Sequence, residues 1–169
     1  VDVLLQGQIV GLPTETVYGL GADATNESAV AQVFIAKNRP RFDPLIVHVP
    51  TLAAVREIAE LSEAAEQLFL AFSPGPLTVV LPKKDTIPDL VTSGHPTVAV
   101  RIPAHPLMLS VLQSSGLYIA APSANPLLKG VHDVSVLEGI YHLPDKLWGC
   151  KAEAPSELRG GVVRRGRGC

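Results

Sequence analysis

Short apolar runs alternate along residues 1–125 with longer segments in which apolar residues recur every three or four positions. The short runs predict buried β-strands, and the periodic segments predict amphipathic α-helices. Helical periodicity begins at Asn26 or Ser28, Thr51, Ser62 and Pro106, all residue types that favour a helix N-terminus. The predicted strands are residues 9–12, 45–49, 77–81, 98–102 and 118–121. This alternation predicts an α/β domain with one main sheet.

The chain length and the spacing of these elements indicate how the domain is organised. Several connections are too short to hold a crossover helix, so we expect a mixed sheet and not a purely parallel one. With 169 residues, 47% of them hydrophobic, the chain is long enough for one substantial core. We expect residues 1–127 to form the main body of the domain. Residues 128–169 are expected to be a divergent C-terminal part of the same domain or an irregular tail.

The periodicity also predicts which helical residues are buried. In the helix after Ser62, the spacing places Ala65, Leu68, Phe69 and Phe72 on one face. No apolar run approaches the ~20 residues that span a bilayer, so we expect no membrane association. No signal peptide is visible, and two cysteines form no disulfide framework, which favours a cytoplasmic location.

Charge is unevenly distributed, although the net charge is only −2. Four arginines cluster near the end of the chain, where a solvated tail is the more common interpretation and RNA binding the alternative. Any anion site in the main body must therefore be built locally. The clustered arginines are Arg159, Arg164, Arg165 and Arg167.

Polar residues of the types used in binding and catalysis follow the predicted strands at the points where those strands end. Ligand sites in open α/β sheets collect at strand ends, so the pattern predicts a small-molecule pocket. Lys37 and Arg39 close the first long helix and, with Arg101, supply positive charge suited to phosphate or carboxylate. The strand-end residues are Thr14, Glu15, Thr16, Tyr18, His48, Thr97, Arg101, Ser123 and Asn125.

Each of these residues also has a purely structural interpretation. Thr14 and Thr16 are common turn formers, and Glu15 is equally well explained as a solvated charge. His48, in an otherwise apolar strand, is more often a hydrogen-bonded core histidine than a functional one. Lys37 and Arg39 fit a helix end in water, and the residues after the last strand fit a cap or turn. The histidines show no metal-ligand spacing, and neither a Walker loop nor a G-x-G-x-x-G motif is present.

Six segments, taken in order and spacing, resemble the YrdC-type threonylcarbamoyl-AMP synthases. The resemblance covers residues 8–125 and includes the family pattern of Lys-x-Arg followed later by Ser-x-Asn, present as Lys37, Arg39, Ser123 and Asn125. The segments are PTETVYGLG (13–21), KNRP (37–40), PLIVH (44–48), PGPLT (74–78), TVAVR (97–101) and APSAN (121–125).

The resemblance implies a twisted mixed sheet flanked by helices and enclosing a positively lined cavity. In that cavity L-threonine, bicarbonate and ATP with Mg²⁺ would form L-threonylcarbamoyladenylate and pyrophosphate, for the t6A modification of tRNA. Possible further partners are tRNA and the downstream threonylcarbamoyl-transfer machinery. The chemistry depends on positioning and on charge neutralisation, which suits these residue types.

The resemblance also implies roles for individual residues. Lys37 and Arg39 would be catalytic, and no protein-bound metal site is implied. Threonine would be held by Thr16, His48, Arg101 and Ala121. ATP would be held by Arg39, Asp43, Thr97, Ser123 and Asn125.

The sequence departs from the family pattern in three places. The segment that starts at Val1 is expected to form only the end of the helix that precedes the first strand in the family. Asp43 stands where many members have Asn, and after Asn125 the usual nucleotide-side signatures are absent. We therefore expect an ATP face that is open and an irregular region beyond Asn125. Two alternatives remain: a carbamoyl-adenylate-forming domain of a carbamoyltransferase, and a non-catalytic YrdC-like module that binds nucleotide or RNA.

Overall fold

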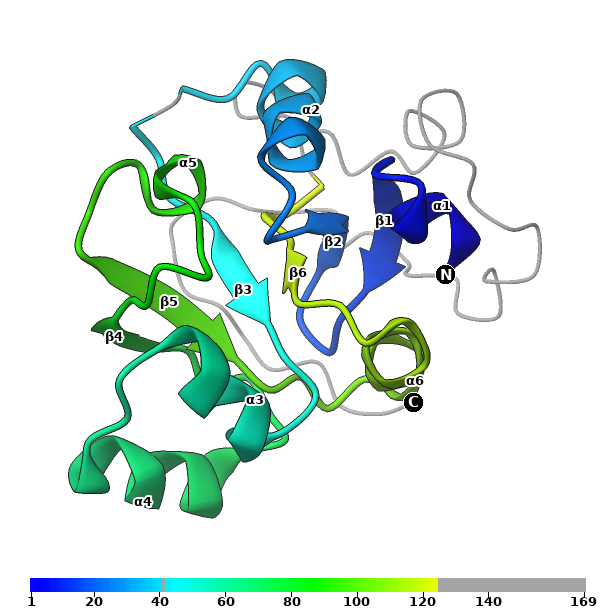
Figure 1. Cartoon of the computed structure of the whole chain (residues 1–169). Coiled ribbons are helices and arrows are strands. Elements are labelled where there is room, and N and C mark those ends of the chain that lie inside the picture. Colours follow the sequence, from blue (N-terminus) through cyan, green and yellow to red (C-terminus); the bar gives the residue numbers. More distant parts are fainter. Residues whose placement is uncertain (41, 125–169) are drawn as a thin grey trace, which may run out of the picture.

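A computed structural model describes residues 1–40 and 42–124 of the chain, and Figure 1 shows the arrangement of their helices and strands. The helices are α1 (Asp2–Leu5), α2 (Glu27–Lys37), α3 (Leu52–Ile58), α4 (Glu63–Phe72), α5 (Asp89–Thr92) and α6 (Pro106–Ser115). The strands are β1 (Val10–Pro13), β2 (Tyr18–Asp23), β3 (Ile46–His48), β4 (Val79–Pro82), β5 (Thr97–Arg101) and β6 (Ile119–Ala120). The predicted region beyond Asn125, with its four arginines, lies outside the described residues.

Within the described residues the strands form one six-stranded sheet in the order β1-β2-β6-β3-β5-β4. Only β3 and β5 pair in parallel, and the four other pairings are antiparallel. The prediction of an α/β domain with a mixed sheet is therefore confirmed. Helices α3 and α4 lie together near β4 and β5, whereas α6 lies beside the β1–β2 hairpin (Figure 1).

The helix boundaries follow from local chemistry that the sequence already displays. The side chains of Asn26, Thr51 and Ser62 each accept a hydrogen bond from a backbone amide in the first turn of α2, α3 and α4. Helix α6 begins at Pro106 and ends before Gly116, whose φ of 67° is readily adopted by glycine. The predicted caps of α3 and α4 and the predicted start of α6 at Pro106 are confirmed, and Asn26 is the cap of α2.

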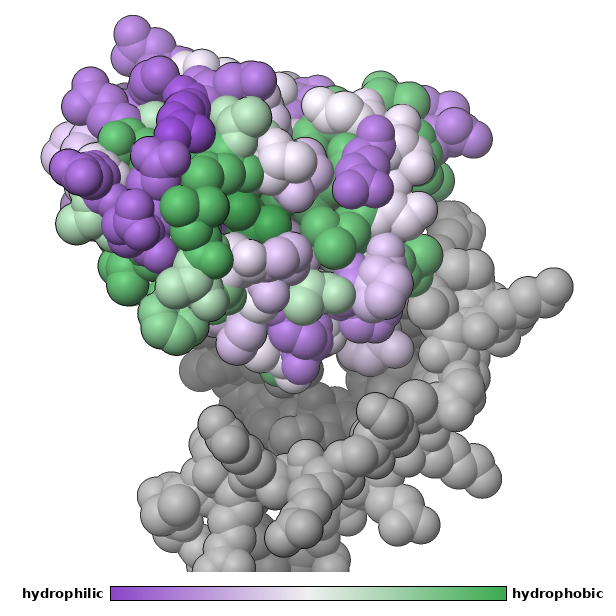
Figure 2. Space-filling model, turned by 90° about the horizontal axis from the view of Figure 1, so that it is seen from below, coloured by the Kyte–Doolittle hydropathy of each residue, from purple (hydrophilic) through white to green (hydrophobic). Residues whose placement is uncertain are grey.

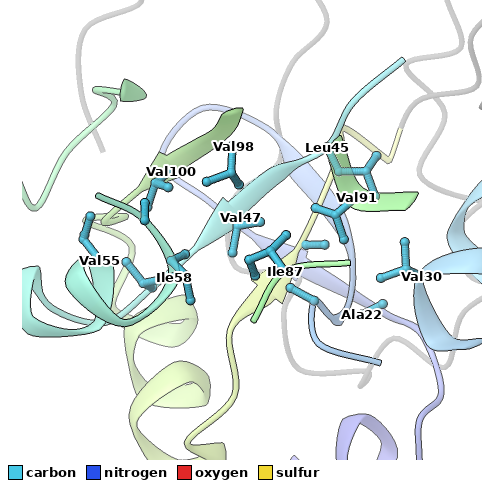
Figure 3. Close-up of a cluster of buried hydrophobic side chains, with 14 of the residues drawn as sticks. Ala22, Val30, Leu45, Val47, Val55, Ile58, Ile87, Val91, Val98 and Val100 are labelled. Carbon is cyan, nitrogen blue, oxygen red and sulfur yellow. The ribbon is translucent and has the colours of Figure 1, made fainter. Parts of the chain in front are cut away.

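The main hydrophobic core lies against one face of the sheet. Val47 of β3 lies near Val98 and Val100 of β5, with Ile87 beside it, as Figure 3 shows. A second cluster joins Leu4, Leu12, Met108, Leu112, Ile119 and Ala121. Because the adjacent residues Ile119 and Ala120 belong to different clusters, the two clusters occupy opposite faces of the sheet.

The predicted buried face of α4 is only half right. Ala65 and Phe69 are buried, but Leu68 is 43% exposed and Phe72 is 60% exposed. The reason is that α4 contacts the rest of the domain along one narrow stripe, so an i, i+4 pair is enough to fill the contact. Figure 2 views the molecule from the side on which α4 lies in Figure 1 and shows apolar residues interspersed with polar ones.

The sequence prediction missed two elements. It did not identify β2 as a strand, because the glycine-rich segment at Tyr18–Asp23 lacks the usual strand composition. Gly21 lets β2 pack closely there, since a Cβ would lie 2.9 Å from Leu12 Cδ1 and 3.0 Å from Ile119 Cγ2 and would displace these side chains. The other is the four-residue helix α5, whereas α1 fits the end of the helix that the resemblance implies before the first strand. Among the described residues no helix combines the length and the apolar character that a membrane crossing requires.

A first prediction concerns the turn between α4 and β4. A Cβ on Gly75 would lie 2.5 Å from the backbone oxygen of Phe72, which cannot move without displacing the turn. Gly75→Ala should lower the free energy of unfolding by about 1–3 kcal/mol, as overpacking typically does. Urea unfolding measures this change, with Gln67→Ala on the exposed side of α4 as the control. Equal stability of the two variants would show that the turn adjusts freely.

Candidate functional site

The site is centred on two buried polar residues at the C-terminal ends of adjacent parallel strands. His48 ends β3 and Arg101 ends β5, and the two are partners in the strand register. His48 is 3% exposed and Arg101 is 6% exposed. Paired residues on neighbouring strands project to the same face, so both side chains lie on one side of the sheet.

The Arg101 guanidinium is held by segments that are distant in sequence. Its Nε donates to the backbone oxygen of Gly75 at 3.2 Å. Its Nη1 donates to Thr16 Oγ1 at 3.3 Å, and its Nη2 lies 2.8 Å from Glu15 Oε1. Arg101 thus joins β5, the turn before β4 and the β1–β2 hairpin.

Glu15 is one of the predicted strand-end residues, but the resemblance implied no role for it. Its side chain is 21% exposed, and Oε1 also accepts a hydrogen bond from the Ala104 amide at 3.2 Å. Burial opposes ionisation, but the contact with Arg101 and the bonds from backbone amides outweigh it and hold the pKa of Glu15 below its ordinary value. Glu15 is therefore an ion-pair partner, and its interpretation as a solvated charge is wrong.

The hairpin loop that carries Glu15 is organised by Thr14. The Thr14 hydroxyl donates to the backbone oxygen of Val17 at 2.6 Å and accepts from the Val17 amide at 3.1 Å. It also lies 3.1 Å from the Thr16 hydroxyl. Thr14 is thus a turn former, whereas Thr16 faces Arg101.

Two buried polar atoms at the centre of the site lack a hydrogen-bond acceptor or donor among the described residues. They are His48 Nδ1 and Arg101 Nη2, the latter because its contact with Glu15 is an ion pair without hydrogen-bond alignment. Buried polar atoms are normally satisfied, so such atoms are candidates for ligand contact. The interpretation of His48 as a fully hydrogen-bonded core residue is therefore not supported at Nδ1.

The environment of His48 keeps its imidazole neutral. Burial is the largest cause and the positive charge of Arg101 the next, and together they lower the pKa of His48 to about 4. At neutral pH His48 therefore offers one nitrogen as a donor and the other as an acceptor.

Lys37, at the end of α2, occupies a second part of the site. It is 6% exposed, and its Nζ donates to the backbone oxygen of Ser123. Burial, reinforced by the nearby charge of Arg39 and opposed by that of Asp43, lowers the pKa of Lys37 to about 8. The interpretation of Lys37 as a solvated helix end is wrong, because the ammonium group is buried against the segment that follows β6.

Arg39 and Asp43 form an ion pair beside Lys37. Arg39 Nη2 lies 2.7 Å from Asp43 Oδ2, and Arg39 also donates to the backbone oxygens of Asp43 and Pro44, each at 3.1 Å. The side chain of Arg39 is 12% exposed and that of Asp43 is 39% exposed. The backbone bonds hold the guanidinium in place independently of the carboxylate.

Residues 121–124 connect the two parts of the site. Ala124 donates to the backbone oxygen of Tyr18, and Leu20 donates to that of Pro122, so this segment extends along β2. The Ala121 amide donates to the backbone oxygen of Ile46 at 3.0 Å. The segment therefore runs from the hairpin that contacts Arg101 to the carbonyl that contacts Lys37.

The remaining predicted site residues are Thr97, Ser123 and Asn125. Thr97 and Arg101 are the first and last residues of β5, which separates them by ~13 Å along the strand. Ser123 contributes a backbone oxygen to Lys37, and its side chain is exposed. Asn125 lies outside the described residues. No group of three or more His, Cys, Asp or Glu side chains within residues 1–40 and 42–124 is arranged to hold a metal ion.

Taken together, these residues define an α/β domain that presents basic and hydroxyl side chains from several strand ends. The family model described as "Telomere recombination" (Sua5, YciO and YrdC) matches residues 2–133. The chain therefore belongs to the Sua5/YciO/YrdC family.

Curated relatives of the chain include two threonylcarbamoyl-AMP synthases. The chain is 50% identical over 121 residues to the threonylcarbamoyl-AMP synthase of Pyrococcus abyssi, covering 71% of this chain and 36% of that protein. It is 44% identical over 142 residues to the Bacillus subtilis threonylcarbamoyl-AMP synthase, covering 83% and 40%. The chain thus spans well under half the length of these relatives.

Solved structures agree with the fold. The structure of P. abyssi Sua5 complexed with L-threonine has a TM-score of 0.72 and 49% identity, covering 73% of this chain and 37% of that one. E. coli YciO has a TM-score of 0.72 at 18% identity, covering 83% and 70%, which supports the fold alone.

A second prediction concerns His48 and pH. Unfolded His48 binds a proton below about pH 6.5, whereas folded His48 binds one only below about pH 4. The free energy of unfolding should therefore fall as pH drops from 6.5 to 4, with this group contributing about 3 kcal/mol.

Denaturant unfolding at several pH values, compared between the wild type and His48→Gln, isolates this contribution because other titrating groups are shared. The wild type should lose more stability than the variant across this window. Parallel curves would contradict the neutral, buried state of His48.

Proposed function

We propose that this chain forms L-threonylcarbamoyladenylate from L-threonine, bicarbonate and ATP, as a nucleotidyl-transferring enzyme of tRNA t6A modification. The observation that carries the proposal is the pair of buried, unsatisfied atoms His48 Nδ1 and Arg101 Nη2 beside the Thr16 hydroxyl. The printed names of the relatives supply the reaction. The cytoplasm is the expected location.

The threonine half of the proposal rests on complementary chemistry. An amino acid presents a carboxylate, an ammonium group and, in threonine, a hydroxyl. The guanidinium of Arg101 suits the carboxylate, because arginine N–H groups match carboxylate geometry. The carbonyl of Ala121 suits the ammonium group, and Thr16 and neutral His48 suit the hydroxyl.

The nucleotide half rests on positive charge. Lys37 and Arg39 lie at the end of α2, are largely buried, and are held by backbone carbonyls. Such preorganised cations stabilise negative charge that develops at phosphate more strongly than solvated ones. Thr97, Ser123 and Asn125 complete the proposed ATP contacts, with Asp43 oriented by Arg39.

The proposed reaction has two steps. The threonine amine attacks bicarbonate carbon, forming the carbamate N–C bond with loss of water. A carbamate oxygen then attacks the α-phosphorus of ATP, and pyrophosphate leaves. The chain's residues hold the amine next to bicarbonate, align the carbamate with the phosphate and neutralise charge. Mg²⁺ would enter with ATP as the counter-ion of its phosphates.

A third prediction tests the reaction itself. Pyrophosphate release from ATP should require both L-threonine and bicarbonate, because each supplies atoms of the acyl group that attacks phosphorus. The measurement is a coupled pyrophosphate assay in CO₂-depleted buffer, with each substrate omitted in turn. Release that is independent of threonine would favour a carbamoyl-adenylate-forming activity, and ATP binding without release would favour a non-catalytic module.

A fourth prediction concerns the two cations. Lys37→Ala and Arg39→Ala should each remove about 2–4 kcal/mol of transition-state stabilisation, because both act on developing charge in a partly desolvated site. The measurement is kcat/KM for ATP.

Lys84→Ala is the matched control, since Lys84 is exposed and its Nζ donates to the backbone oxygen of Arg56, far from Lys37 and Arg39 in sequence. Thermal unfolding monitors the integrity of each variant. Near-normal kcat/KM in both Lys37→Ala and Arg39→Ala would remove these residues from the catalytic role.

A further inference from the structure

The hairpin loop places a carboxylate against the one buried arginine of the proposed threonine half. Glu15 Oε1 lies 2.8 Å from Arg101 Nη2, and the same oxygen accepts the Ala104 amide at 3.2 Å. One carboxylate oxygen therefore links the β1–β2 hairpin to both the end of β5 and the segment that follows it.

The contacts of Arg101 divide into two kinds. Nε and Nη1 make hydrogen bonds to Gly75 and Thr16, whereas Nη2 contacts Glu15 without hydrogen-bond alignment. The ion pair thus attracts the guanidinium although Nη2 makes no hydrogen bond to Glu15. Glu15 therefore restrains Arg101 and leaves Nη2 hydrogens available for a ligand carboxylate.

The ion pair is also partly shielded from water. The Arg101 side chain is 8% exposed and that of Glu15 is 21% exposed, so their attraction is less screened than that of a surface pair. An arginine side chain loses rotamer entropy when it is fixed. A partner that fixes the guanidinium in the free protein removes this cost from ligand binding.

We propose that Glu15 is a positioning residue that holds the Arg101 guanidinium ready for a substrate carboxylate and so sets the affinity for threonine. The inference rests on the proposed function for its ligand. Glu15 acts through Arg101 and takes no part in bond formation.

The experiment compares wild type with Glu15→Gln, which keeps the shape and an acceptor for Ala104 but removes the charge. Glu60→Gln is the matched control, because Glu60 is exposed and its side chain has no ion pair among the described residues. Glu15→Gln should raise KM for threonine about tenfold, while kcat and KM for ATP change less than about twofold.

A ligand-free measurement separates this inference from the proposed function. The Arg101 Nε–H signal in ¹⁵N NMR, identified by its loss in Arg101→Lys, should exchange faster with solvent in Glu15→Gln. Glu60→Gln should leave that exchange rate unchanged. Unaltered exchange in Glu15→Gln would overturn the positioning of the guanidinium by Glu15.

The remaining outcomes are also decisive. A lower KM for threonine in Glu15→Gln would mean that Glu15 competes with the substrate for Arg101, which overturns the inference. Faster Nε–H exchange with unchanged KM would reduce Glu15 to a structural role and also overturn it. If wild type neither binds threonine by calorimetry nor releases pyrophosphate, the proposed function fails, and the exchange measurement still decides whether Glu15 holds Arg101.

Discussion

The buried guanidinium of Arg101 is the interaction on which the site depends. A charge that is 6% exposed is stable in a fold only when partners surround it, and here the partners come from the β1–β2 hairpin and the turn before β4. These segments are 85 and 26 residues away in sequence. Arg101 therefore fixes both the shape of the site and the mutual position of two loops.

The sheet makes this arrangement possible because of one parallel pairing. Since β3 and β5 run in the same direction, His48 and Arg101 end their strands side by side. The positive charge of Arg101 and the burial of His48 then keep the imidazole neutral. The mixed topology thus determines the protonation state of a residue in the proposed threonine half.

Glycines allow close approach where the site meets the core. Gly19 pairs with Ser123, and a Cβ there would lie 3.1 Å from Ala121 Cβ. Gly75 provides the carbonyl that accepts from Arg101 in a turn with no room for a side chain. The segment at 121–124 can therefore lie directly against β2, which connects the surroundings of Arg101 to the carbonyl that Lys37 contacts.

The sequence by itself determined the fold class, the helix caps and most candidate site residues, because capping and hydrophobic periodicity are local and each appears in a few residues. It did not reveal β2, whose glycines matter only through the strands packed beside them, or the half-exposed face of α4. The role of Glu15 also had no local signal: an acid between two threonines becomes an ion-pair partner only when the fold brings residue 101 within 3 Å of it. Burial and charge pairing depend on contacts between distant segments, and the tertiary structure alone decides those.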